Sequence, residues 1–145
     1  MQGIKAFIPT AQKVQYLQSL LRVGFDTIDF GSFVSPKAIP QMADTAEVLA
    51  QLDLSTTSSK LLAIVANSRG ALAAASHKEI DYLGYPFSIS ENFQMRNTNK
   101  SIEESILELT RIIELANKNK KELSNASVTF YSKYERRSYY QSRDH

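Results

Sequence analysis

The sequence has 145 residues, of which 43% are hydrophobic and 22% are charged, and its formal net charge is +2. A chain of this length can bury about 70% of its unfolded surface as one domain, and so small a net charge indicates no particular partner. No apolar run reaches the roughly 18 residues of a membrane span, and the absence of cysteine excludes disulfides, thiolate metal sites and a cysteine nucleophile.

The first part of the chain predicts a helix followed by a strand. Residues 1–5 lack the apolar segment and cleavage site of a signal peptide, so we expect a cytoplasmic location. From Thr10, the expected N-cap, apolar residues recur at the spacing of an amphipathic helix as far as Val23. Gly24 occupies the position of a C-terminal helix glycine, and the apolar segment 25–30 predicts a buried strand.

A long connection with two prolines follows this strand and ends at Asp44. The spacing between Asp44 and Glu47 predicts reciprocal capping at the start of a second helix, residues 45–52. Long ordered connections in α/β proteins are often functional, which makes this loop the first candidate site. The alternative is a surface loop that closes one end of a barrel.

The middle of the chain continues to alternate strands and helices. Residues 60–66 form a nearly continuous apolar run, which is typical of a strand buried in a parallel sheet. A turn at 67–70 precedes a short alanine-rich helix at 71–76. The next strand lies within residues 80–89, and Pro86 marks an irregularity in it or its end.

The last predicted helix has the clearest start signal. Residues 90–100 are polar and rich in asparagine, and Ser101 with Glu104 then forms a capping box. The basic run 118–121 follows this helix and suits the negative end of its dipole better than a nucleic-acid contact. Strands and helices in this order predict a parallel sheet with right-handed crossovers, and no dinucleotide or P-loop fingerprint is present.

The long connection carries a family resemblance. Its residues Ser32-Phe33-Val34-Ser35-Pro36-Lys37-Ala38-Ile39-Pro40-Gln41-Met42 resemble the loop after the second strand of hydroxymethylglutaryl-CoA lyases. The similarity continues through Asn67-Ser68-Arg69-Gly70, 88–93 and 99–105, and covers roughly residues 1–120. It implies an α/β fold that is a partial (β/α)8 TIM barrel of about three βα units, because a complete barrel needs about 250 residues. It also implies an acyl-CoA substrate, cleaved in the family to acetyl-CoA and acetoacetate.

The resemblance carries three site positions into this sequence. Asp29, the candidate catalytic residue, matches a family glutamate that supports the catalytic centre, with a carboxylate one methylene shorter. The alternative for Asp29 is a strand-end carboxylate that caps nearby N–H groups. Gln2 and Ser32 are the candidate substrate-binding residues. Ser32 matches a serine that hydrogen-bonds the bound acyl group, and Gln2 matches the glutamine that follows the family's metal-binding aspartate.

The resemblance also implies parts of the family site that this chain lacks. A divalent metal, Mg or Mn, serves the full-length family, held by an aspartate expected before Met1 and by two histidines and an asparagine from late loops. Neither His77 nor His145 lies in a ligand pattern, and the family's catalytic cysteine has no counterpart, so we expect no metal to bind this chain alone. We therefore predict a lyase-like fragment that is inactive as this chain alone.

The end of the chain departs from the family. Tyrosines interleave with lysine and arginine after residue 124, a composition that could bind single-stranded nucleic acid, although we favour a frayed or out-of-frame tail and expect no nucleic-acid partner. We therefore divide the chain into a partial barrel, 1–123, and a divergent basic Tyr/Arg/Ser-rich tail, 124–145. The alternative function is a non-catalytic binding or assembly module, formed by the half-barrel or by this tail. Unpaired barrel edges also predict self-association.

Overall fold

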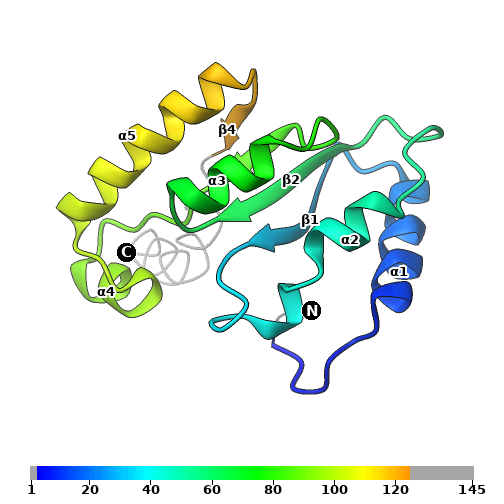
Figure 1. The fold of residues 1–145 in the computed structure, drawn as a ribbon, viewed down its shortest axis with the longest axis horizontal. Helices are drawn as coiled ribbons and strands as arrows, with labels where there is room; N and C mark the ends of the chain where they lie inside the picture. Colours follow the sequence, from blue (N-terminus) through cyan, green and yellow to red (C-terminus); the bar gives the residue numbers. More distant parts are fainter. Residues whose placement is uncertain (1–2, 125–145) are drawn as a thin grey trace, which may run out of the picture.

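The computed structural model describes residues 3–124, so Gln2, His145 and nearly all of the predicted tail lie outside the described residues (Figure 1). The elements in chain order are α1 (Thr10–Val23), β1 (Thr27–Phe33), the 3-10 helix η1 (Pro40–Met42), α2 (Thr45–Ala50), β2 (Lys60–Val65), α3 (Ser68–Ala75), β3 (Tyr82–Gly84), α4 (Glu91–Thr98), α5 (Ile102–Lys118) and β4 (Glu122–Ser124). None of the helices in this range is long and apolar enough to cross a membrane.

The strands form one parallel sheet in the order β1-β2-β3-β4. Each strand therefore pairs with the next one along the chain, and a helical segment connects each pair. In Figure 1, α3 lies over β2, and α2 and α5 lie on either side of α3. The predicted parallel sheet is confirmed.

The apolar core lies between the sheet and the helices. On β2, Leu61, Ala63 and Val65 are buried, whereas Leu62 and Ile64 on the opposite face are only half-buried. Burial of one leucine side chain contributes about 2 kcal/mol, so this alternation fixes which face of the strand meets the helices. The helical side chains in the same core are Leu17, Leu21, Val48, Leu49, Ala71, Ala74, Ile112 and Ala116.

Several predicted boundaries were wrong. Strand β1 begins at Thr27 and continues to Phe33, three residues into the predicted loop. Helix α3 begins at Ser68, so the predicted turn is its first turn. The polar segment 90–100 contains α4, and β4 adds a further short strand that ends at Ser124, next to the predicted domain boundary.

The predicted N-cap at Thr10 was wrong, and the predicted capping bond of Asp44 is absent. Pro9 stands at the N-cap of α1, and Thr10 is the first helical residue. Asp44 stands at the N-cap of α2, as predicted, but its side chain makes no capping bond. The two side chains bond to each other instead, with Thr10 Oγ1 donating to Asp44 Oδ2 at 2.7 Å. By contrast, Gly24 adopts the left-handed conformation at the end of α1 with φ of 79°, as predicted.

Candidate functional site

A β-bulge places Asp29 and Ser32 on the same face of the sheet. Residues three apart in a regular strand point to opposite faces. Here the register with β2 shifts between Asp29 and Gly31, so that Asp29 pairs with Leu62 and Ser32 pairs with Ile64. Since Leu62 and Ile64 share one face of β2, their partners share the corresponding face of β1. The structure thus brings together the two described candidate residues.

The Asp29 carboxylate lies on this face in partly desolvated surroundings. The residue is exposed, yet desolvation by nearby protein atoms raises the pKa of Asp29, and a backbone hydrogen bond with Gly31 partly offsets that effect. Because the side chain still reaches water, solvent screening limits the effect of the raised pKa. The bond with Gly31 agrees with the alternative of a capping carboxylate, while the raised pKa suits an acid–base group.

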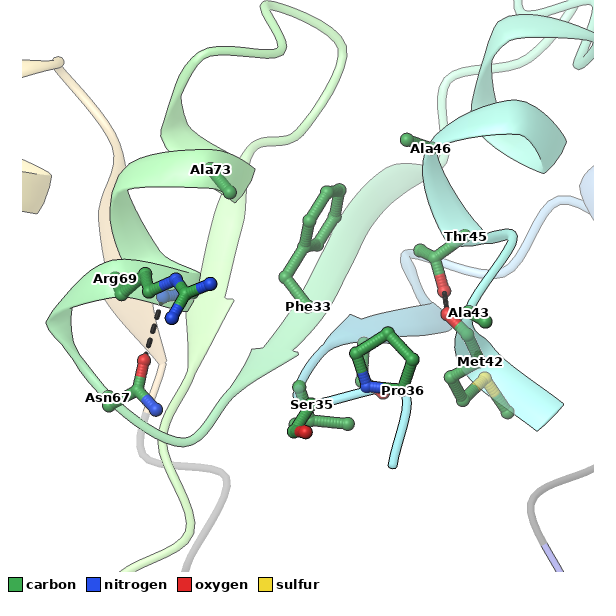
Figure 2. A pocket seen from close by; sticks show the side chains of 13 residues that line it. Phe33, Ser35, Pro36, Met42, Ala43, Thr45, Ala46, Asn67, Arg69 and Ala73 are labelled. Atoms are coloured by element: carbon green, nitrogen blue, oxygen red, sulfur yellow. Dashed lines mark hydrogen bonds between the residues drawn. The ribbon is translucent and has the colours of Figure 1, made fainter. Parts of the chain in front are cut away.

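Ser32 also lines a pocket of about 320 Å³ at the carboxyl end of β1. The pocket opens between the first turns of α2 and α3, and Figure 2 shows Phe33 between its two walls. Ser32 is 6% exposed, and its Oγ makes no hydrogen bond within the described part of the chain. A buried hydroxyl without a partner costs free energy, and the register places this one on the face that Ser32 shares with Asp29, away from the helices.

The α3 wall of the pocket begins with Asn67. Its side chain caps the helix by accepting from Gly70 N at 2.8 Å. Gly70 packs so closely on β1 that an added Cβ would lie 2.2 Å from the carbonyl oxygen of Phe33. Between them, Arg69 is exposed and lines the pocket. Arg69 was not predicted as a site residue; its position in the first turn of a helix that follows a parallel strand was the available signal.

The β1–α2 loop is fixed to the start of the described chain by Gln41. This side chain is 5% exposed. Its Oε1 accepts from Ile8 N at 2.8 Å, and its Nε2 donates to Ala6 O at 2.8 Å and to Ile4 O at 3.1 Å. The Pro-Gln pair of the loop motif therefore has a structural function, since Pro40 opens η1 and Gln41 ties it to residues 4–8.

The residues described do not fit the divalent metal that the resemblance implies. Within residues 3–124, no group of three or more histidine, cysteine, aspartate or glutamate side chains is arranged to hold a metal ion. His77 instead lies beside Phe33, with ring centroids 5.4 Å apart.

Comparison with known proteins relates most of this chain to one kind of enzyme. No family model matches the chain. The mitochondrial hydroxymethylglutaryl-CoA lyase of Gallus gallus is 35% identical over 117 residues, which are 80% of this chain and 38% of that protein. The cytoplasmic 3-hydroxy-3-methylglutaryl-CoA lyase of Rattus norvegicus is 34% identical over 118 residues, 80% of this chain and 33% of that protein. The chain therefore spans 33% to 38% of the length of these relatives.

Solved structures agree with the sequence comparison. The HMG-CoA lyase of Brucella melitensis matches with a TM-score of 0.78 and 35% identity over 84% of this chain and 42% of that one. An HMG-CoA lyase of Acinetobacter baumannii, solved in complex with coenzyme A and 3-methylmalate, matches with a TM-score of 0.77 and 29% identity over 84% of this chain and 39% of that one. These matches confirm the predicted resemblance and the predicted partial barrel.

Proposed function

Because this chain is related over most of its length to hydroxymethylglutaryl-CoA lyases, we propose that it is a lyase-like partial barrel that binds an acyl-CoA and does not cleave it alone. The observation that carries the proposal is the shared face of Asp29 and Ser32. On that face, the Ser32 hydroxyl can hydrogen-bond an acyl oxygen, and the Asp29 carboxylate can orient or accept a nearby hydroxyl proton. Gln2, the other proposed substrate-binding residue, lies outside the described residues.

Inactivity of the isolated chain is the second part of the proposal. In the family, a divalent metal, Mg or Mn, serves the cleavage of the acyl-CoA. The described residues offer no cluster that fits such an ion, and the whole sequence offers no cysteine. We therefore expect the chain to contribute substrate contacts but to release no acetoacetate without further barrel residues.

Self-association is the third part. In the described sheet, β1 and β4 are the outer strands, and parallel edge strands tend to pair with further chains. Helix α5 also exposes apolar side chains, with Ile106 49%, Leu107 64% and Ile113 41% exposed. These surfaces support an oligomeric rather than a monomeric chain, which sedimentation velocity would measure.

Two finer predictions stay open. The named relatives include both mitochondrial and cytoplasmic enzymes, so the cytoplasmic location is still a prediction. The alternative of a binding or assembly module, formed by the half-barrel or by the tail, also stays a prediction, and the tail lies almost wholly outside the described residues. Salt-dependent binding of single-stranded nucleic acid that disappears on deletion of residues 125–145 would support that alternative.

The proposed function is tested with purified chain in two assays. Calorimetric titration with hydroxymethylglutaryl-CoA should show binding that Ser32→Ala weakens, whereas Ser76→Ala, at the far end of α3, should leave it unchanged. An acetoacetate assay with excess magnesium or manganese should show no release above a metal-free control. Metal-dependent release would contradict the proposed inactivity, and absence of acyl-CoA binding would contradict the proposed function as a whole.

A further inference from the structure

One face of α5 carries exposed apolar side chains between two exposed acidic ones. Ile106, Leu107 and Ile113 are 49%, 64% and 41% exposed. Glu103 and Glu114 are exposed as well, and the five residues recur at the spacings of three, four and seven that define one helical face. An exposed apolar surface with a polar rim usually marks a contact with another segment or protein.

The α5 face is open within the part of the chain that the structure describes. Helix α5 packs against α3 on one side, and Figure 1 shows α5 at the border of the described fold. Strand β4 follows after a short turn, in which Lys121 N donates to Ala116 O at 2.9 Å, and it ends at Ser124. Because a strand of a parallel sheet runs back along the helix before it, β4 ends alongside α5.

The sequence that follows β4 complements this face in charge and composition. Residues 125–145 contain four basic and two acidic side chains, together with five aromatic ones. The α5 face has the opposite charge, because Glu103 and Glu114 border it and the nearby Arg111 pairs with Glu108 at 3.8 Å. The face extends about 16 Å from Glu103 to Glu114, whereas 21 residues can reach about 30 Å even as a helix.

We propose that segment 125–145 of the same chain covers this face of α5, with its aromatic side chains on Ile106, Leu107 and Ile113 and its basic side chains near the two glutamates. Attachment to β4 gives the segment a high effective concentration at α5. A second copy of α5 fits the face less well, because like charges would meet. The inference rests on the proposed function in one respect, since it leaves the strand edges β1 and β4 for self-association.

Trypsin reports this contact in the full chain, because segment 125–145 contains cleavage sites after Lys133, Arg136 and Arg137. Mass spectrometry follows cleavage at these sites, and a synthetic peptide of residues 125–145 gives the rate for the unbound segment. Where opening is fast relative to cleavage, the rate follows the population of the open form. We expect the full chain to be cleaved about tenfold more slowly than the peptide. Equal rates would overturn the proposal and indicate a frayed tail.

Variants of the full chain locate the contact on α5. Leu107→Ser should accelerate cleavage about fivefold, whereas Leu72→Ser, at a 56% exposed leucine on α3, should not. Glu114→Gln should also accelerate cleavage, and Glu47→Gln, at an exposed glutamate on α2, is its control. Equal effects of a variant and its control would overturn the contact with α5. Circular dichroism of each variant verifies that it is folded.

Dilution and two further measurements separate the remaining outcomes. Protection from trypsin that does not change on dilution supports a contact within one chain, whereas protection that is lost on dilution overturns it in favour of a second copy. Acyl-CoA binding should be unchanged in Leu107→Ser, because the α5 face lies apart from Asp29 and Ser32. A full chain that sediments as a monomer but retains its protection contradicts the proposed self-association and supports the contact with α5.

Discussion

Lys13 Nζ lies 2.6 Å from Asp44 Oδ1, and the two side chains are only 3% and 10% exposed. The same ammonium donates to Gln41 O at 2.5 Å and lies 4.1 Å from the centre of the Phe7 ring. One buried cation thus joins α1 to the end of the β1–α2 loop and to the segment before α1. The loop that follows Ser32 is therefore anchored at its far end by a contact 31 residues away in sequence.

The first prediction concerns this ion pair. Lys13→Met should destabilise the chain by roughly 3 kcal/mol, because it leaves the Asp44 carboxylate withdrawn from water without its cation. Urea unfolding followed by circular dichroism measures the change. Lys60→Met is the matched control, since Lys60 is 53% exposed in its pair with Asp81 and should cost less than about 1 kcal/mol. Equal effects of the two substitutions would contradict the anchoring function of Lys13.

The second prediction is a pH dependence of the same group. Desolvation opposes ionisation of Asp44, but hydrogen bonds from Lys13 and Thr10 outweigh it and lower the pKa. A carboxyl with a lowered pKa in the folded state contributes stability above its unfolded pKa of about 3.9, and this contribution is lost as the pH falls through the folded value. The difference in unfolding free energy between the native chain and Asp44→Asn should therefore be full at pH 6 and shrink below about pH 4. A difference that does not change with pH would show that Asp44 acts through packing alone.

The third prediction concerns the hydrogen bonds between the Gln41 side chain and residues 4–8. Gln41→Leu keeps the size of the side chain but removes three hydrogen bonds to residues 4–8, leaving the Ile8 N–H without its acceptor. Amide hydrogen exchange at Ile8 should accelerate, while exchange in β2 should change little if the loss is local. Gln41→Glu retains the acceptor for Ile8 and should protect that amide better than the leucine variant does. Unchanged exchange at Ile8 in Gln41→Leu would show that these hydrogen bonds do not hold residues 4–8 in place.

The sequence predicted those features that depend on local contacts. Ser101 and Glu104 form the predicted capping box because both partners lie in one helical turn. The same pattern at Asp44 and Glu47 failed because Lys13, far away in sequence, binds the Asp44 carboxylate. A local pattern does not reveal such a competitor.

The unpredicted parts of the fold depend on contacts of the same non-local kind. Helix α4 has no apolar periodicity, but Gln94 is 1% exposed and donates to Ser105 Oγ on α5 at 2.6 Å. The bulge after Asp29 leaves no mark in the strand pattern, although it decides that Asp29 and Ser32 share a face. The resemblance supplied these two residues, and only the register with β2 shows how they meet.

The last prediction concerns Gly70, where α3 approaches the end of β1. Gly70→Ala would place a Cβ 2.2 Å from the backbone oxygen of Phe33, and a backbone atom cannot move aside as a flexible side chain can. We expect a loss of roughly 1 to 3 kcal/mol in unfolding free energy, because the first turn of α3 must shift away from β1. Gly3→Ala is the control, since no atom lies within 4 Å of a Cβ built there. Urea unfolding of both variants measures the change. Native stability of Gly70→Ala would show that the close contact between α3 and β1 is not required.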